Sequence, residues 1–424
     1  MPDFYSDFVG TPSQDAVQLV LKSGNQRDEI RIYGGYQVKN NLLTQPSAFS
    51  FDVGWGDTAL ELLKLFNAED GNTKPYPEFE LRVAGTTFQS GIVEAVNVPS
   101  GNTTTLHIEG RDWLMPLYKS GILNEVTFSK TTYVEVLQEI VDKVVPGGSA
   151  KHQILSNYGA DRDLVTKLPK FGRKRKVKSD MSKNQLVAQI ETGINAPGGG
   201  KIVTQQLLAK VGETWFQWLD KELKLAGLLL WATWGGNYII GSPTLDQPAR
   251  YHIIRERGQS RNEVNVTNHG YTNDLKGQHT SVIVYGRHGS GAGGRAKAAA
   301  GWVNVLAAQK MGGNFYPLVI EDEYLRNDAQ AMWRAKRAVS EELRAGFSLK
   351  YTCAGHRMPC IIEGLENEMI VWMPDTIVRV DDYELGIHKD MYVEGVTMNS
   401  SPETTTTVDL IPPEYLNFFA EVGS

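Results

Sequence analysis

The sequence predicts a mainly β protein with α/β segments in the middle of the chain. Short segments rich in β-branched and aromatic residues occupy both ends, at 17–109 and 347–411, and turn residues separate them. Capped segments with one apolar helical face lie between and within these β regions. Because evenly spaced strands are typical of a barrel or sandwich, we expect a β structure near each end of the chain.

The first 110 residues are expected to form β-strands with one short helix. Turn signals such as Ser23-Gly24-Asn25 and Pro99-Ser100-Gly101-Asn102 separate the apolar runs. Asp57 is a candidate cap for the helical stretch ALELLKLF. The expected strands are 17–21, 29–33, 79–83, 87–98 and 103–109.

The middle of the chain predicts helices. Thr132 with Glu135 forms one capping box, before a helix that Pro146 stops, and Thr214 with Gln217 forms a second. After the second helix, LLLWATW and NYIIGSP flank Gly235-Gly236, which predicts a hairpin.

The C-terminal part returns to strands around one further helix. Segments 251–255 and 280–286 predict strands, and Asn327 caps a helix that ends at Gly346. Apolar runs from 347 to 411 predict the remaining strands. The β character of both ends is compatible with a diverged duplication, which a single sequence does not establish.

Length and composition bound the function. A chain of 424 residues predicts two to four domains, and a formal net charge of −6 gives no global attraction to nucleic acid or anionic membrane. No apolar run reaches the roughly 20 residues that span a bilayer, so we expect no stable membrane insertion. The N-terminus does not resemble a signal peptide. Cys353 and Cys360 cannot form a disulfide framework and are expected to be free thiols, although the sequence leaves their state open.

A glycine run raises the question of nucleotide binding. Gly289, Gly291 and Gly294 match G-x-G-x-x-G after an apolar run. A dinucleotide loop needs its glycines directly between a strand and a helix N-terminus, whereas Arg287 and His288 intervene here. We therefore expect a mobile connection and no bound cofactor.

The dense basic cluster has two interpretations. One is an arm that contacts phosphate, and the other is a solvated loop. Pro169 and Gly172 flank the run and no aromatic series accompanies it, which favours the loop. The cluster consists of Lys170, Arg173, Lys174, Arg175, Lys176 and Lys178.

No catalytic or metal-binding motif is evident. The eight histidines form no H-x-H or H-E-x-x-H pattern, and the cysteines form no C-x-x-C pair. His356, between the two cysteines, is explained equally well by a turn. Ser290 lies in H-G-S-G-A and not in a nucleophile elbow. We expect no catalytic residues, no metal ligands and no enzyme activity.

Three stretches together resemble a known family. They are TTTLHIEGRDWLMPLYKSGI at 103–122, GETWFQWLDKELKLAGLLLWATWGGNYIIGSP at 212–243, and the segment 369–415 with its W-M-P-D step and final TTTTVDLIPPEY. In order and spacing they are similar to the baseplate hub proteins of contractile-tailed bacteriophages, of the bacteriophage Mu type and late-control D family. The resemblance covers most of the chain apart from 146–210, which looks like an enlarged insertion.

This resemblance implies an architecture and a set of partners. Two tail-tube-like β-barrels would be joined by mixed α/β regions, and three copies would form a ring of six barrels. The implied partners are the central spike and the tail tube, with the tape measure protein and baseplate wedge proteins as further candidates. DNA would meet the chain only by passage through the channel. The implied location is the tail baseplate of the virion, assembled in the cytoplasm of the bacterial host.

The domains expected on this basis are four. Residues 1–112 form the first barrel and 113–245 the α/β connecting domain with a polar insertion near 146–210. Residues 246–286 and 347–415 form the second barrel, and 287–346 form an inserted loop and helix. The alternatives are a nucleotide-binding enzyme that uses 289–294, a cell-wall hydrolase fused to a tail part, and a different tail component such as a tube or an injected effector.

Overall fold

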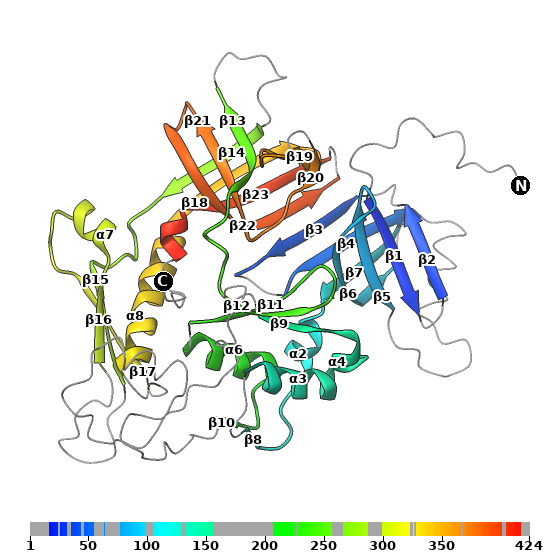
Figure 1. Cartoon of the computed structure of the whole chain (residues 1–424), viewed down its shortest axis with the longest axis horizontal. Helices are drawn as coiled ribbons and strands as arrows, with labels where there is room; N and C mark the ends of the chain where they lie inside the picture. The colour runs from blue at the N-terminus through cyan, green and yellow to red at the C-terminus, as the bar shows by residue number, and fades with distance from the viewer. Residues whose placement is uncertain are drawn as a thin grey trace, which may run out of the picture.

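Figure 1 shows a computed structural model of the chain, in which two curled β structures lie above a layer of helices and short strands. The structure describes residues 17–23, 26–31, 35–43, 46–54, 63, 77–98, 105–128, 133–156, 207–225, 227–256, 266–286, 299–322, 325, 328–365, 368–400 and 404–416.

The first β structure, lobe 1, comes from the N-terminal quarter of the chain. Its strands are β1 (Val17–Ser23), β2 (Gln26–Arg31), β3 (Tyr36–Asn41), β4 (Ala48–Gly54), β5 (Glu78–Val83), β6 (Thr86–Asn97) and β7 (Thr105–Asp112). They pair in the order β3-β4-β7-β6-β5-β1-β2, and every neighbouring pair is antiparallel.

The second β structure, lobe 2, comes from the C-terminal half. Its strands are β13 (Ala249–Arg255), β14 (Val266–Asn273), β18 (Phe347–Ala354), β21 (Thr376–Asp382), β22 (Ile387–Asn399) and β23 (Thr405–Ile411). They pair in the order β14-β18-β23-β22-β21-β13. A hairpin of β19 (Arg357–Pro359) and β20 (Met369–Val371) and a 3-10 turn, η2 (Pro413–Leu416), complete this part.

The two lobes have the same strand order when their strands are numbered along the chain. Strands β1, β3, β4, β5, β6 and β7 of lobe 1 correspond to β13, β14, β18, β21, β22 and β23 of lobe 2. A β-bulge falls at the same point in both, between Val93 and Ala95 of β6 and between Val393 and Gly395 of β22. Two differences remain: β2 has no counterpart, and β13 runs parallel to β21 whereas β1 is antiparallel to β5. The lobes are therefore two versions of one topology.

An α/β layer separates the lobes in sequence and lies beneath them. It contains α2 (Met115–Lys119), β8 (Val126–Phe128), α3 (Tyr133–Val144), α4 (Gly148–Lys151), β9 (Ile154–Ser156), β10 (Leu207–Ala209), α6 (Trp215–Leu225), β11 (Leu229–Ala232) and β12 (Tyr238–Gly241). The capping box predicted for α6 is confirmed, because Gln217 N–H donates to Thr214 Oγ1 at 3.2 Å and Thr214 N–H donates to Gln217 Oε1 at 3.1 Å. The predicted hairpin is also confirmed as β11–β12.

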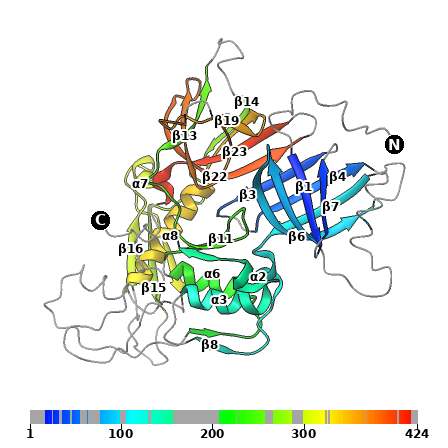
Figure 2. The ribbon, with the colours of Figure 1, turned by 45° about the vertical axis from the view of Figure 1, so that its right-hand side comes forward.

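A small outer unit projects beside lobe 2 (Figure 2). It contains β15 (Ser281–Gly286), β16 (Ala299–Val303), α7 (Val305–Lys310), β17 (Pro317–Asp322) and the long helix α8 (Asp328–Ala345). The sequence placed β15 in the second barrel, but it lies in this unit as the central strand of the sheet β16-β15-β17. Val282 and Val284 of β15 are buried in one cluster with Ala335 and Val339 of α8, and a buried apolar run gives no sign of which sheet it will join.

Alternation of side chains fixes the cores of the lobes. Phe79, Leu81 and Val83 of β5 point inward while the residues between them are partly exposed. Most buried apolar residues of both lobes form one continuous hydrophobic cluster. The predicted fold class, mainly β with α/β segments and two β regions, is confirmed. The predicted short helix after Asp57 lies outside the described residues except for Leu63.

Candidate functional site

The seam between the two lobes is the first candidate site. Strand β3 of lobe 1 pairs antiparallel with the C-terminal half of β22 of lobe 2, with Val38 opposite Met398 and Asn41 opposite Gly395. This pairing joins the lobes into one 13-stranded sheet. Val38 and Met398 are both buried. A backbone ladder backed by buried apolar side chains thus joins the two lobes into one sheet with a shared core.

A buried histidine reinforces the seam. His356 Nε2 lies 2.5 Å from the hydroxyl of Tyr36 on β3, and its Nδ1 lies 2.9 Å from Thr406 Oγ1 on β23. Thr406 donates its own proton to the Gly355 carbonyl, so its hydroxyl accepts from His356 Nδ1–H. His356 Nε2 therefore accepts from Tyr36. The turn that the sequence suggested for His356 is present, but its side chain also connects the lobes.

The bulge of β22 brings the Asn41 side chain of β3 close to Gly395. A Cβ added to Gly395 would lie 2.7 Å from Asn41 Nδ2, so glycine permits this approach. Leu42 N–H donates to the Glu394 carbonyl at 3.1 Å, and the Glu394 carboxylate pairs with Arg344 of α8. The outer unit is thereby tied to the seam.

Two motif residues of the sequence analysis are carboxyls that stabilise turns, and of these Asp112 is buried and Asp375 is partly buried. Asp112 accepts hydrogen bonds from Ser47 N–H at 2.8 Å and Leu114 N–H at 3.0 Å, where lobe 1 meets α2. Asp375, in the W-M-P-D step, has a φ of 58° and accepts from Thr244 N–H at 2.7 Å and the Tyr392 hydroxyl at 3.0 Å. An acidic side chain tolerates this left-handed backbone and satisfies local donors, which explains why aspartate stands there.

Burial raises the pKa of Asp112 to about 7. Between about pH 4 and pH 7 the folded protein holds a proton that the unfolded chain has released, so this group lowers the free energy of unfolding as the pH rises. Asp112→Asn has no such proton. We expect the stability difference between the two proteins to change across this range by about 1.4 kcal/mol per pH unit, as measured by urea unfolding at several pH values. If the free energies of unfolding of the two proteins changed equally with pH, the raised pKa of Asp112 would be contradicted.

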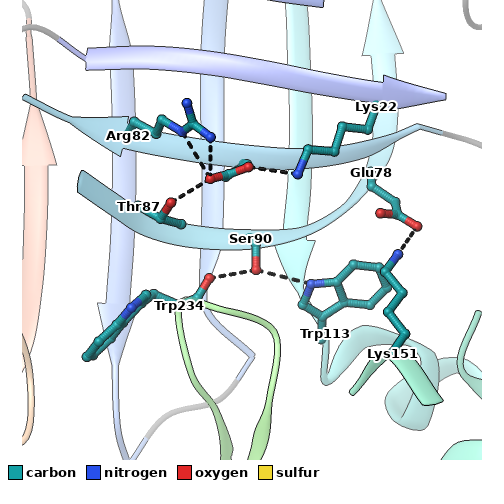
Figure 3. Close-up of polar contacts among 9 residues, drawn as sticks. Lys22, Glu78, Arg82, Thr87, Ser90, Trp113, Lys151 and Trp234 are labelled. Carbon is teal, nitrogen blue, oxygen red and sulfur yellow. Dashed lines mark hydrogen bonds and ion pairs between the residues drawn. The ribbon is translucent and has the colours of Figure 1, made fainter. Parts of the chain in front are cut away.

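The contact between lobe 1 and the α/β layer is shown in Figure 3. Ser90 of β6 accepts from Trp113 Nε1 at 3.2 Å and donates to the Trp234 carbonyl at 2.6 Å, in the β11–β12 turn. Lys151 of α4 pairs with Glu78 of β5, and its Nζ lies 4.7 Å from the ring centroid of Trp113. These contacts join three elements of the layer to the β5–β6 hairpin.

The same hairpin carries an ion cluster centred on Glu80. Its carboxylate accepts from Lys22 at 2.8 Å, Arg82 at 2.9 Å and Thr87 at 2.5 Å (Figure 3). Burial by itself raises the pKa of Glu80, but these hydrogen bonds outweigh it and lower the pKa to about 2. The cluster is permanently charged at neutral pH and holds β1, β5 and β6 in register.

The outer unit presents an apolar sheet face. Val303, Val319 and Tyr285 are exposed on the side of the sheet away from α8, and Phe315 and Tyr316 precede β17. This face is a second candidate contact surface.

A charged cavity of about 320 Å³ lies between α6 and α8. Its cations are paired within the cavity or beside it: Arg337 Nε with Glu341 at 2.6 Å, Lys224 with Asp220, and Lys221 with Glu213. Arg334 Nε lies 3.6 Å from Asp322. Because positive and negative groups alternate here, the cavity has no strong preference for an anion or a cation.

The glycine and basic runs lie outside the described residues, but the strands around the glycine run are described. Residues 287–298 connect β15 to β16, and these two strands pair antiparallel with Tyr285 opposite Ala299. The connection thus joins two strands of a hairpin, whereas a dinucleotide turn joins a strand to a helix. Cys353 and Cys360 are buried free thiols, and burial raises the pKa of Cys353 to about 12.

Within the described part of the chain, no group of three His, Cys, Asp or Glu side chains is arranged to hold a metal ion. The helices described there are each too short or too polar to cross a membrane.

Comparison with known proteins places the fold. No protein-family model matches the sequence, and no curated protein matches it. Among solved structures, a 43 kDa tail protein of prophage MuSo2 from Shewanella oneidensis has a TM-score of 0.62 and 16% identity, over 94% of this chain and 99% of that one. A tail protein from Neisseria meningitidis MC58 has a TM-score of 0.65 and 16% identity, over 93% and 96%. The half-lidded PdpA–VgrG complex from Francisella has a TM-score of 0.52 and 10% identity, over 97% of this chain and 60% of that one. The chain therefore shares its fold over nearly its whole length with two tail proteins, one of them from a prophage.

Proposed function

We propose that this protein is the baseplate hub of a contractile phage tail or a related injection particle. Three copies would form a ring that adapts the sixfold tail tube to a threefold central spike. The observation that carries the proposal is the repeated topology, since a chain with two equivalent lobes supplies six lobes in a trimer. The similarity of nearly the whole chain to two tail proteins supports it.

The proposal includes the partners and location that the sequence resemblance implies. The ring would contact the central spike and the tail tube, with tape measure and wedge proteins as further contacts, and DNA would pass through its channel. It would reside in the tail baseplate after assembly in the host cytoplasm. The four domain boundaries expected from the sequence belong to this proposal, with β15 moved from the second barrel to the outer unit. The role is structural and involves no catalysis.

The alternatives are less well supported. A nucleotide-binding enzyme at 289–294 would need a strand–turn–helix unit, whereas the described strands on either side, β15 and β16, pair antiparallel with each other. A tube protein needs only one barrel, whereas this chain has two lobes.

The mass of the purified chain in solution tests the proposal. Light scattering is expected to give three times the mass of one chain, alone or after addition of the tube and spike proteins, because closed cyclic assembly leaves no contact surface unused. Negative-stain averages of the complex should show a ring with six peripheral lobes. A chain that stays monomeric in the presence of both partners would contradict the proposal, and tight binding of ATP or NAD would favour the enzyme alternative.

A further inference from the structure

The repeated topology allows the contact between copies to be specified, on the premise of the trimeric hub proposed above. Within one chain, the seam pairs an edge of lobe 1, strand β3, with an edge of lobe 2, the C-terminal half of β22. We call these a β3-type edge and a β22-type edge. The counterpart of β3 is β14, and the counterpart of β22 is β6. Each chain therefore holds one further β3-type edge, on β14, and one further β22-type edge, on β6.

The residue correspondence follows from the strand registers. Val93↔Gly110 in lobe 1 matches Val393↔Leu410 in lobe 2, at the same bulge. One strand further out, Phe49 pairs with Gly110 in lobe 1, and Leu349 pairs with Leu410 in lobe 2. On the outermost strand of each lobe, Val38 pairs with Phe49, and Tyr271 pairs with Leu349. Tyr271 of β14 thus occupies the position of Val38, and Val98 occupies that of Met398.

Both of these counterpart edges lack a strand partner among the described residues. Strand β14 is the last strand of the large sheet and pairs only with β18. Residues 95–97 of β6 pair with β7 on one side, while β5 on the other side reaches only as far as Ile92.

Exposure of the side chains follows the same pattern. Val38 and Met398, which face each other across the seam, are 1% and 0% exposed. Tyr271 and Val98, at the corresponding positions, are 45% and 48% exposed. An exposed edge strand is an unsatisfied hydrogen-bonding surface that native proteins cover or protect.

We propose that β14 of one copy pairs antiparallel with residues 95–98 of the next copy, in the register of the internal seam. Tyr271 would then face Val98 of the next copy, and Thr272 would face Asn97 of the next copy. The occupant is a second copy of this chain, because the same pairing already joins the two lobes within one chain. In the trimeric hub proposed above, three such head-to-tail contacts would close the ring.

Charge at the new seam is compatible with this arrangement. Residues 95–98 and the strand β14 carry no acidic or basic side chain other than His269. Asp274 would take the place of Asn41 beside Glu94, but Glu94 already pairs with Arg111 at 2.8 Å and Lys119 at 2.7 Å. Main-chain hydrogen bonds and the Tyr271–Val98 contact would supply the affinity.

Cysteine cross-linking tests the register. We expect a mixture of Val98→Cys and Tyr271→Cys proteins, oxidised under non-reducing conditions, to give a band at twice the chain mass as the major product. The wild-type chain is the blank, because Cys353 and Cys360 are buried. The matched control is Val98→Cys mixed with Thr272→Cys, which moves the thiol to the opposite face of the same strand and should give no such band.

A second measurement separates this inference from the hub proposal. Tyr271→Asp should raise the concentration for half-assembly by about tenfold or more, whereas Leu123→Asp, on an exposed residue outside both edge strands, should leave it unchanged. A wild-type trimer that gives no Val98–Tyr271 cross-link, or cross-links the offset pair equally, would overturn this register and leave the hub intact. A persistent monomer with tube and spike present would overturn the hub itself.

Discussion

Asp382→Ala is expected to lower the free energy of unfolding by about 3–5 kcal/mol, because it removes one partner of a buried ion pair. The Asp382 carboxylate is fully buried in lobe 2 and accepts two bonds from Arg255 Nη1, at 3.0 and 3.2 Å. It also accepts from the Tyr351 hydroxyl at 2.7 Å and from two backbone N–H groups, of Glu384 and Leu385. Alanine would leave all of these donors without this acceptor.

Urea unfolding followed by circular dichroism measures this loss. The matched control is Asp390→Ala, since Asp390 is exposed and lies 3.4 Å from Arg379 in a surface pair worth at most about 1 kcal/mol. Equal effects of the two substitutions would show that Asp382 is not the anchor of lobe 2.

The Asp382 carboxylate also makes the free energy of unfolding depend on pH in the acid range. Burial by itself raises the pKa of Asp382, but the hydrogen bonds from Leu385, Tyr351 and Arg255 outweigh it, so the pKa is lowered. A lowered folded pKa means that this stabilisation is complete above the unfolded pKa of about 3.9 and is lost as the pH falls below it. Asp382→Ala should therefore differ least from the wild type in strong acid.

His356→Ala is expected to cost about 3 kcal/mol, because it opens a cavity at the seam and removes one hydrogen-bond partner of the partly buried Tyr36 hydroxyl and one of the buried Thr406 hydroxyl. The side chain connects Tyr36 of lobe 1 to Thr406 of lobe 2, so the loss falls on the coupling between lobes. Calorimetry should show a lower unfolding temperature for the variant.

His252→Ala is the control for this prediction. His252 is also a hydrogen-bonded histidine of lobe 2, 2.7 Å from Asp381, but about a third of its side chain is exposed. Its loss should cost no more than about 1 kcal/mol. A His356 variant as stable as the His252 variant would contradict the assigned role of the seam.

Local rules explain which elements the sequence predicted correctly. The capping box of Thr214 and Gln217 satisfies orphan helix donors with side chains three residues apart, so it can be read from the sequence alone. The β11–β12 hairpin likewise depends on Gly236, whose φ is 84°. The sequence shows Gly110 and Asp112 as a motif, but it does not show why these residue types are needed. The structure does: a Cβ on Gly110 would lie 2.4 Å from the Phe49 ring, and Asp112 is a buried acceptor.

The candidate contact residues could not be predicted in this way. Val98 and Tyr271 are unremarkable in sequence, and only their counterparts in the other lobe give them meaning. The correspondence is nearly invisible in the residues, since Val93-Glu94-Ala95-Val96 resembles Val393-Glu394-Gly395-Val396 but Phe49 matches Leu349 and Gly110 matches Leu410. Different side chains fill equivalent core positions, because a core requires volume and apolarity more than identity.

By itself the sequence determined the fold class, the helices α3, α6 and α8, the β11–β12 hairpin and the resemblance to a tail hub, because turns, caps and alternation act over a few residues. The tertiary structure alone decided that β3 pairs with β22, that β15 belongs to the outer unit, and that two edges have no strand partner among the described residues. Those outcomes depend on strand pairings between residues as many as 362 positions apart, such as Gln37 and Asn399, and backbone hydrogen bonds carry no side-chain signature of their partner.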